Sequence, residues 1–373
     1  MPEVAEVAHF CAQLRRQVVG YTIKYANLPQ DKLAFPQLSK EEPTVESTDS
    51  LRDILIGKKV KGTGRHGKYF WLQFSPHDKF PVILLMHMGM TGNIKIEGVE
   101  SHMIMMENGG DKRAKEELEL ENKKPNKVIL NDTSQWPPKH TRFDLVFVSE
   151  TDPDDEVKVA FIDPRRLGRI WVFSDSSCIS AERLLKRHPL DKLGPDYSKD
   201  PNFDKSAVKE YTTGDPDPNP HDRPRLGFEA FSKLILSRKR AIKVLLLDQN
   251  LFAGIGNWVA DEILYHARLH PNELLSTKIK QPTNTLMRKL YDAIIYVMEY
   301  CVKVEANVKE YPKDWLMLYR WGKARKKVQA TTKAGLLVKY ETVNGRTSSY
   351  VPELQKFLEI EVVNDRRNDT AKN

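Results

Sequence analysis

The stretch Gly254-Ile255-Gly256-Asn257-Trp258-Val259-Ala260-Asp261-Glu262 places two glycines directly before an apolar run with helical spacing. We therefore expect a tight turn followed by a helix that begins at Asn257. The N-terminus of a helix presents unpaired backbone N–H groups that suit a phosphate, and the glycines allow a close approach to them. An ordinary asparagine cap after a glycine turn explains the same residues equally well.

The chain around this stretch reads as helical from 225 to 309. Amphipathic periodicity predicts helices over 230–248, 258–267 and 284–304. The first of these helices carries a basic face, which consists of Arg238, Lys239, Arg240 and Lys243. The basic face is consistent with a phosphate held near Asn257.

A β-hairpin is predicted close to the C-terminus. The runs 336–340 and 349–351 are connected through Val343-Asn344-Gly345-Arg346, and Asn-Gly is a favoured hairpin turn pair. An arginine at the tip, Arg346, can reach a phosphate in a groove, although exposed turn arginines are common. The tail after about 358 is polar, and we expect it to be frayed.

The N-terminal half has a different pattern. Apolar residues at helical spacing predict a helix over 3–19, which Gly20 would end. Short apolar runs bounded by turn residues then predict the strands of an antiparallel β-sandwich. The runs lie at 69–74, 82–86, 143–148, 157–162 and 169–173.

Two segments interrupt these patterns. Residues 99–139 are crowded with charges of both signs, and we expect a solvated, largely disordered insertion without chemistry there. Residues 199–224 are rich in Pro, Asp and Asn and read as a linker between domains. The fold class is thus α+β, with domains at 1–198 and 225–358 and a flexible tail at 359–373.

Composition sets further bounds. With 373 residues the chain is long enough for two domains, and its net charge of +8 suits a polyanionic partner without proving one. The three cysteines, Cys11, Cys178 and Cys301, lie far apart and lack metal-ligand spacing, so we expect three unpaired thiols. We see no signal peptide and no membrane-spanning run, and we expect a soluble intracellular protein.

The start of the chain, Met1-Pro2-Glu3, offers a nucleophile. If Met1 is removed, Pro2 becomes a secondary amine, partly unprotonated at neutral pH, that can attack an electrophilic carbon. The resulting iminium is an electron sink, and Glu3 is close enough to exchange a proton. A chain can also begin with Met-Pro without any such purpose.

Four quoted segments together resemble the formamidopyrimidine-DNA glycosylase family, the bifunctional repair enzymes related to endonuclease VIII. The segments are Pro2-Glu3, His87-Met88-Gly89-Met90-Thr91-Gly92, Asp163-Pro164-Arg165-Arg166-Leu167-Gly168 and the stretch 254–262. The resemblance covers about 2–98, 140–198 and 224–355. It implies an N-terminal helix with a β-sandwich, followed by a helical domain with a helix-two-turn-helix motif.

The resemblance also implies the partner and the cofactors. Most members hold the hairpin with a four-cysteine zinc site, whose cysteines are absent here, so the chain resembles the zincless-finger branch. We expect no metal, no cofactor, damaged double-stranded DNA as the partner, a monomer, and a nuclear location. The run KARKK at 323–327 could serve as an import signal or contact DNA.

The same resemblance assigns roles to the candidate catalytic residues. Pro2 is the nucleophile, Glu3 the proton donor and shuttle, and Glu6 orients the site or braces the first helix. Lys68 matches the phosphate-binding lysine, although a solvated lysine at a strand end is the simpler alternative. A start with Ala5, where the family usually has proline, is a minor departure.

Further residues are expected to contact DNA. Phosphate contacts are implied for His87, Arg166, Asn257 and Arg346. Residues that fill the gap left by the extruded nucleotide are Met90, Arg165 and Leu167. Packing in the core is the alternative for Met90, and Leu167 replaces the usual phenylalanine, which puts discrimination of the opposite base in doubt.

The connection from Val304 to Trp315 is short and lacks glycine, whereas bacterial members have a loop here that closes over 8-oxoguanine. We expect weak activity on 8-oxoguanine and better activity on formamidopyrimidines, hydantoins and abasic sites. Two other classes of function stay open. One is an enzyme with abasic-site lyase activity alone, and the other is a non-catalytic protein that binds damaged DNA.

Overall fold

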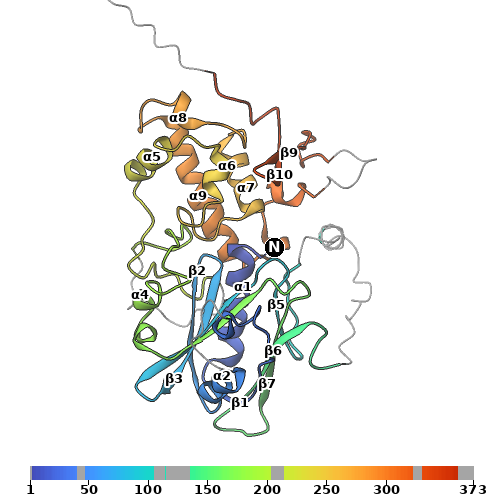
Figure 1. Ribbon diagram of the computed structural model, residues 1–373. Coiled ribbons are helices and arrows are strands. Elements are labelled where there is room, and N and C mark those ends of the chain that lie inside the picture. The colour runs from blue at the N-terminus through green and yellow to red at the C-terminus, as the bar shows by residue number, and fades with distance from the viewer. Residues whose placement is uncertain are drawn as a thin grey trace, which may run out of the picture.

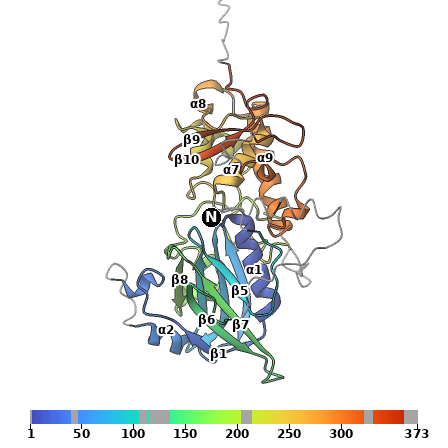
Figure 2. The same ribbon diagram turned by 90° about the vertical axis from the view of Figure 1, so that its right-hand side faces the viewer.

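The computed structural model describes residues 2–39, 47–104, 114, 135–202, 214–321 and 330–359. Two halves are stacked, a β-sandwich and a helical half with a hairpin, and the N-terminus lies at their junction (Figures 1 and 2). This arrangement confirms the predicted fold class. None of the described helices combines the length and the apolar character that a membrane span requires.

The first helix, α1 (Val4–Val18), belongs to both halves, and it confirms the helix predicted over 3–19. Phe10 and Leu14 pack into the core of the sandwich. Val4 and Ala8, on the first turns, are buried in the core of the helical half. Because α1 is buried in two cores, its N-terminal end is fixed where the halves meet.

Two four-stranded antiparallel sheets form the sandwich, and they contain all the predicted strands. The first sheet has the order β1 (Thr22–Asn27), β6 (Thr141–Val148), β7 (Glu156–Ile162) and β5 (Asn93–Ile96). The second has the order β2 (Val60–His66), β3 (Tyr69–His77), β4 (Phe80–His87) and β8 (Arg169–Phe173).

Short helices complete this half: η1 (Pro36–Leu38), α2 (Thr48–Leu55), η2 (Ser176–Ile179) and α4 (Ala181–Leu184). The strand pairing of the second sheet matters for the site. Tyr69 is paired with His87, and His87 is paired with Arg169. The chain on either side of these residues, the β2–β3 turn and the segment after β4, therefore leaves the sheet at one end, the end nearest the helical half.

The helical half contains more breaks than predicted. Its elements are α5 (Phe228–Leu236), α6 (Ile242–Leu246), α7 (Asn257–Ala267), α8 (Leu275–Lys278), α9 (Thr285–Lys303), η4 (Val308–Glu310) and η5 (Leu316–Leu318). The helices predicted over 258–267 and 284–304 are confirmed. The single helix predicted over 230–248 is wrong, because the amides of Ile242 and Lys243 donate to the carbonyls of Glu273 (2.9 Å) and Pro271 (3.2 Å) instead of continuing α5.

The C-terminal hairpin pairs β9 (Lys339–Val343) with β10 (Arg346–Tyr350). Asn344 and Gly345 both have positive φ, 47° and 75°, as a two-residue turn of this twist requires, so the predicted turn is confirmed. An apolar cluster holds the base of the hairpin on the helical half, and it comprises Tyr265, Leu316, Val338 and Val351. The assignment to the zincless-finger branch stays a prediction.

The segment 99–104 packs against the helical half, in contrast to the solvated insertion expected over 99–139. Ile104 is buried in the core of the helical half, and the ring of His102 hydrogen-bonds the carbonyl of Glu305 at 2.9 Å. The rest of the prediction lies outside the described residues except at 114 and 135–139.

The predicted linker is also anchored where it is described. The side chains of Lys199 and Asp217 are buried, and Lys199 donates to the carbonyl of Asp217. The carboxylate of Asp217 in turn accepts from the amide of Arg65 in β2 at 3.0 Å. Residues 203–213, the KARKK run and the tail after 359 lie outside the described residues.

Candidate active site at the junction of the two halves

Glu3 connects the start of α1 to the start of α7. Its two carboxylate oxygens accept hydrogen bonds from the amides of Trp258 and Val259, both at 3.0 Å, and the side chain is 2% exposed. A carboxylate in this position is stabilised by the positive end of the helix dipole. The helix N-terminus predicted to attract a phosphate therefore offers two of its amides to Glu3 instead.

A second carboxylate, Glu6, supports the first. It accepts from the amide of Glu3 at 2.9 Å and from the indole nitrogen of Trp258 at 3.2 Å. Burial, and secondarily the charge of Glu3, raises the pKa of Glu6 to about 7. The site thus contains a buried carboxyl group that changes its protonation near neutral pH, and it is bonded to the residue next to Pro2. Pro2 itself is buried.

Two glycines of the stretch 254–256 make this contact possible. A Cβ atom at Gly256 would lie only 2.1 Å from Cδ of Glu3, so no other residue leaves room for the carboxylate. The carbonyl of Gly254 accepts a hydrogen bond from the amide of Val4 at 3.2 Å. A Cβ atom added at Gly67 would lie only 2.9 Å from the amide nitrogen of Gly254. The glycine turn is therefore pressed against both α1 and the β2–β3 turn.

Lys68 follows Gly67 and points at the same stretch. Its ammonium group donates to the carbonyl of Ile255 at 2.9 Å. Burial lowers the pKa of Lys68 to about 8, with the charges of Glu3 and Glu6 opposing the shift and that of Arg346 adding to it. The alternative of a lysine solvated at a strand end is therefore wrong. The charge of Lys68 interacts with the carboxylate of Glu3.

His87, at the end of β4, faces this group as a neutral ring. Burial lowers its pKa to about 4, and the charge of Lys68 contributes to the shift. Its Nδ1 accepts from the amide of Gly89 at 3.2 Å, and its ring lies 4.6 Å from that of Tyr69. The remaining ring nitrogen therefore carries the hydrogen at neutral pH and can donate to a phosphate without a charge.

Met90 and Leu167 lie on two loops in contact. A Cβ at Gly89, where φ is +58°, would come within 2.4 Å of the backbone of Leu167. The side chains of Met90 and Leu167 are each 37% exposed, a high value for large apolar residues. The core-packing alternative for Met90 is therefore wrong, since the core position belongs to Met88.

Asp163 shapes the second of these loops. One carboxylate oxygen accepts from the amides of Leu167 and Gly168, both at 2.7 Å, and the other accepts from the amide of Arg165 at 3.2 Å. The side chain is fully buried. Asp163 belongs to the quoted motif, but its sequence position alone does not reveal this organising role.

Arg166 differs from its expected use. Its φ is +56°, and its guanidinium forms two hydrogen bonds to the carboxylate of Asp31, at 2.8 and 3.1 Å. A phosphate at Arg166 would have to share the guanidinium with Asp31. The neighbouring Arg165 has an exposed side chain and presents its charge to solvent.

Asn257 and Arg346 connect α7 with the hairpin. Asn257 is the first residue of α7, after Gly256 as the cap, and its side-chain amide donates to the carbonyl of Thr347 at 2.9 Å. Arg346 is exposed at the hairpin tip, near enough to Lys68 for its charge to lower the pKa of that lysine. The structure thus brings the hairpin tip to the same junction as Glu3 and Lys68.

The predicted basic face needs one correction. Arg238, Lys239 and Arg240 are exposed in the break between α5 and α6, but Lys243 is fully buried in an ion pair with Asp261. Asp261 also accepts from the guanidinium of Arg320 at 2.7 Å and from the amide of Ser349 at 3.0 Å. The carboxylate of Asp261, within the mostly apolar run 258–264, is the sequence signal of such a buried partner.

Comparisons with known proteins agree with this geometry. The sequence models of the formamidopyrimidine-DNA glycosylase N-terminal domain and H2TH domain match residues 1–170 and 215–311. The formamidopyrimidine-DNA glycosylase of Arabidopsis thaliana is 27% identical over 357 residues, which cover 96% of this chain and 71% of the relative. That of Prochlorococcus marinus (strain MIT 9215) is 25% identical over 374 residues, with coverages of 95% and 100%.

A solved complex of Lactococcus lactis Fpg with abasic-site DNA has the same fold, with a TM-score of 0.60 and 19% identity over 95% of this chain and 100% of that chain. A β-sandwich joined through its first helix to a helix-two-turn-helix half defines a DNA glycosylase that acts on damaged DNA. The two matched domains cover most of the sequence, and the chain belongs to the formamidopyrimidine-DNA glycosylase family.

Proposed function

We propose that this protein is a bifunctional DNA glycosylase and abasic-site lyase of base excision repair, with the amine of Pro2 as its nucleophile. The observation that carries the proposal is the buried pair Glu3 and Glu6, which is bonded to α7 directly beside Pro2. Two carboxylates, one of them with a pKa of about 7, provide a place to store and release protons next to an amine. A protein that only binds DNA has no need of the Pro2-Glu3 pair.

In the proposed reaction the Pro2 nitrogen attacks C1′ of the extruded nucleotide. Glu3 takes the proton that the Pro2 nitrogen loses and passes it to the oxygen of the opening sugar ring. The damaged base leaves with the bonding electrons and takes a proton from water. The iminium makes the C2′ proton acidic. Elimination of the 3′ phosphate and then of the 5′ phosphate leaves a one-nucleotide gap. Water then hydrolyses the iminium, which frees Pro2 and releases the sugar remnant. Glu6 braces the first helix and orients the site through the hydrogen bond that it accepts from the backbone amide of Glu3.

We further propose that oxidised purines with an opened ring, hydantoins and abasic sites are better substrates than 8-oxoguanine. The support is the connection after α9, where Tyr311 and Trp315 are buried with their rings stacked at 5.2 Å. This connection is packed into the helical half, which leaves little chain to close over a base. Comparable excision of 8-oxoguanine and formamidopyrimidine would contradict this preference.

The remaining parts of the proposal concern the partner. Damaged double-stranded DNA would bind along the exposed residues Met90, Arg165, Leu167 and Arg346, with the hairpin as a zincless finger held by apolar packing. A single bound duplex suits a monomer. Repair of genomic DNA would place the protein in the nucleus.

Borohydride trapping tests the central proposal. Duplexes with formamidopyrimidine, 8-oxoguanine or an abasic site would be incubated with the wild type, Pro2→Gly and Glu3→Gln, after mass spectrometry has confirmed Pro2 as the N-terminus. A covalent complex on formamidopyrimidine DNA that requires Pro2 is expected. Trapping on the abasic duplex alone would indicate the lyase-only alternative, and no trapping would leave a DNA-binding protein.

A further inference from the structure

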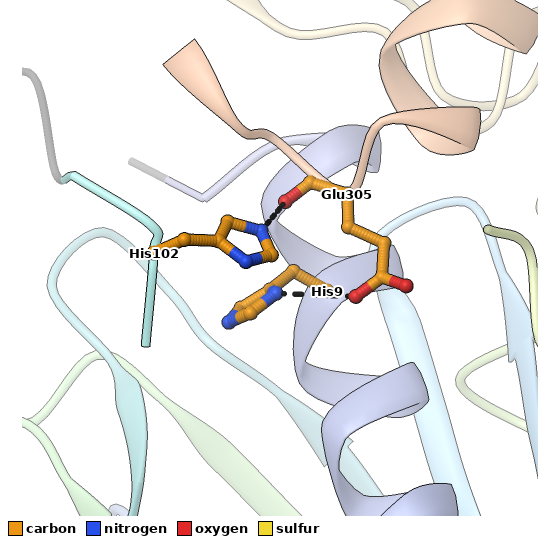
Figure 3. Close-up of side chains that lie close together, drawn as sticks. All are labelled: His9, His102 and Glu305. Carbon is orange, nitrogen blue, oxygen red and sulfur yellow. Dashed lines mark hydrogen bonds and ion pairs between the residues drawn. The ribbon is translucent and has the colours of Figure 1, made fainter. Parts of the chain in front are cut away.

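A cluster of nitrogen and oxygen ligands lies outside the candidate active site, about one turn further along α1 than Glu6. His9 from α1, His102 from the segment 99–104 and Glu305 just after α9 each offer one ligand atom, and these atoms lie within 4.8 Å of one another (Figure 3). Three segments far apart in the sequence thus meet at one point. His9 and Glu305 are buried, whereas His102 is exposed.

Each histidine has one ring nitrogen held by a neighbour. Nε2 of His102 faces the carbonyl of Glu305 at 2.9 Å, and since a carbonyl only accepts, this nitrogen carries the hydrogen. Nε2 of His9 lies 2.7 Å from the hydroxyl of Ser101. Metal-ligating histidines typically have such a partner on the second nitrogen, which fixes the ring and leaves Nδ1 for the ion.

The two Nδ1 atoms are directed into the cluster. Nδ1 of His9 is buried without a hydrogen-bond partner among the described residues, and it lies 3.4 Å from Oε2 of Glu305. Figure 3 shows the ring of His102 above that of His9, and their centroids are 4.5 Å apart.

The hydrogen bonds of the Glu305 carboxylate leave one of its two oxygens, Oε2, with room for a further bond. Arg16 donates to both carboxylate oxygens at 2.8 Å, and the amide of Gly214 donates to Oε1 at 2.9 Å. Oε2 therefore has fewer hydrogen bonds than Oε1, and it is the oxygen that faces His9. The positive charge of Arg16 weakens the attraction of a cation but also keeps the carboxylate ionised and fixed.

We propose that His9, His102 and Glu305 bind one divalent transition-metal ion, with Zn²⁺ as the ion that suits two imidazoles and a carboxylate best. Bonds of about 2.0–2.1 Å in a tetrahedral site set ligand atoms about 3.4 Å apart, which His9 and Glu305 already satisfy. A small shift of the exposed His102 ring toward the other two ligand atoms, which lie within 4.8 Å of its own, completes the site. The bound ion joins α1, the segment 99–104 and the end of α9.

Calorimetric titration of Zn²⁺ into the full-length chain, freed of metal by a chelator, tests the site. The wild type should bind one equivalent with micromolar or tighter affinity, and Co²⁺ should give the strong visible absorption of a tetrahedral complex. His102→Asn should weaken Zn²⁺ binding at least about tenfold. Because this side chain is exposed, the fold should persist in the variant.

His77→Asn is the matched control, since His77 is a partly exposed histidine at the end of β3 far from the cluster. Its Zn²⁺ affinity should equal that of the wild type. Equal affinities of the wild type and His102→Asn would overturn the site and show binding elsewhere. The absence of heat and of the cobalt absorption at micromolar protein would overturn it as well.

Discussion

Gly256 is the glycine of the candidate site with the least room for a side chain, because the Glu3 carboxylate fills the space that a Cβ would take. The glycine has an extended backbone that any residue can adopt, with φ of −120°, so its requirement is steric. The missing side chain leaves the space that the Glu3 carboxylate fills on its way to the amides of Trp258 and Val259. A methyl group added at position 256 can therefore test whether the reaction depends on the position of the Glu3 carboxylate.

Gly256→Ala should displace Glu3 and lower the rate of borohydride trapping on an abasic duplex by about two orders of magnitude, as a misplacement of about 1 Å can. Gly62→Ala is the control, because a Cβ at Gly62 meets no atom within 4 Å. The control should retain the wild-type rate. A wild-type rate in Gly256→Ala, with the fold verified by circular dichroism, would contradict the role of Glu3.

Glu6 should make stability depend on pH. Its pKa is about 7 in the folded chain against 4.5 for the free group, so the folded state holds the proton more tightly. The stability that this proton contributes is complete below pH ~4.5 and is lost as the pH rises through about 7. Between pH 5 and 8.5 the unfolding free energy should fall by about 2–3 kcal/mol. Denaturant unfolding from pH 5 to 8.5 measures it.

Glu6→Gln serves as the comparison, since the amide cannot titrate. The variant should be less stable than the wild type at pH 5, because one of the two donors facing Glu6 loses its acceptor. Its loss of stability between pH 5 and 8.5 should nevertheless be smaller than that of the wild type by about the same 2–3 kcal/mol. Parallel curves for the two proteins would exclude Glu6 as the titrating group.

The hairpin of β9 and β10 functions as a unit that positions one charge. Its base is fixed by the apolar cluster around Val338 and Val351 and by the bond from Ser349 to Asp261. Its tip presents Arg346, the exposed residue after the Asn-Gly turn. We infer that Arg346 contributes one phosphate contact, independent of DNA sequence.

Arg346→Ala should weaken DNA binding about equally for damaged and undamaged duplexes. It should also reduce the slope of log affinity against log salt concentration by about one unit, which corresponds to one phosphate. Fluorescence anisotropy over a series of salt concentrations measures both. Lys339→Ala, an exposed residue of the same hairpin away from the tip, should leave the slope unchanged.

The two halves of the molecule are joined by a buried ion network as well as by α1. Arg65 in β2 is fully buried, and its guanidinium donates to Asp196 at 2.6 Å, to Asp215 at 2.7 Å and to Ser198 at 2.8 Å. Asp196 and Ser198 directly precede the segment 199–224, which the sequence predicts as a linker between domains, and Asp215 lies within it. The network therefore fixes the path of the chain between the halves.

Arg65→Ala should destabilise the folded chain by about 3–5 kcal/mol, because it leaves buried carboxylates without a partner. Lys24→Ala removes an exposed ion pair with Glu156 and should cost at most about 1 kcal/mol. Ser198→Ala removes only a neutral hydroxyl of the network, so its destabilisation should lie between those of Lys24→Ala and Arg65→Ala. Equal costs for Arg65→Ala and Lys24→Ala, from denaturant unfolding, would contradict the importance of the network.

Local patterns in the sequence predicted much of this fold. Alternating and helical periodicities placed α1, α7, α9 and the main strands, because one face of each element must be buried. The Asn-Gly pair predicted the hairpin turn, because its positive φ angles are local properties. The motifs around Pro2, His87, Asp163 and Asn257 predicted which segments meet, but not which atoms bond.

Tertiary structure alone decided the partners of the buried polar groups. The break between α5 and α6, the ion pair of Lys243 with Asp261, and the contact of Arg166 with Asp31 all depend on residues distant in sequence. The same is true of Glu3, which occupies amides that the sequence offered to a phosphate. A residue type sets what a side chain can bind, whereas burial beside a particular partner determines which bond forms and which proton it holds.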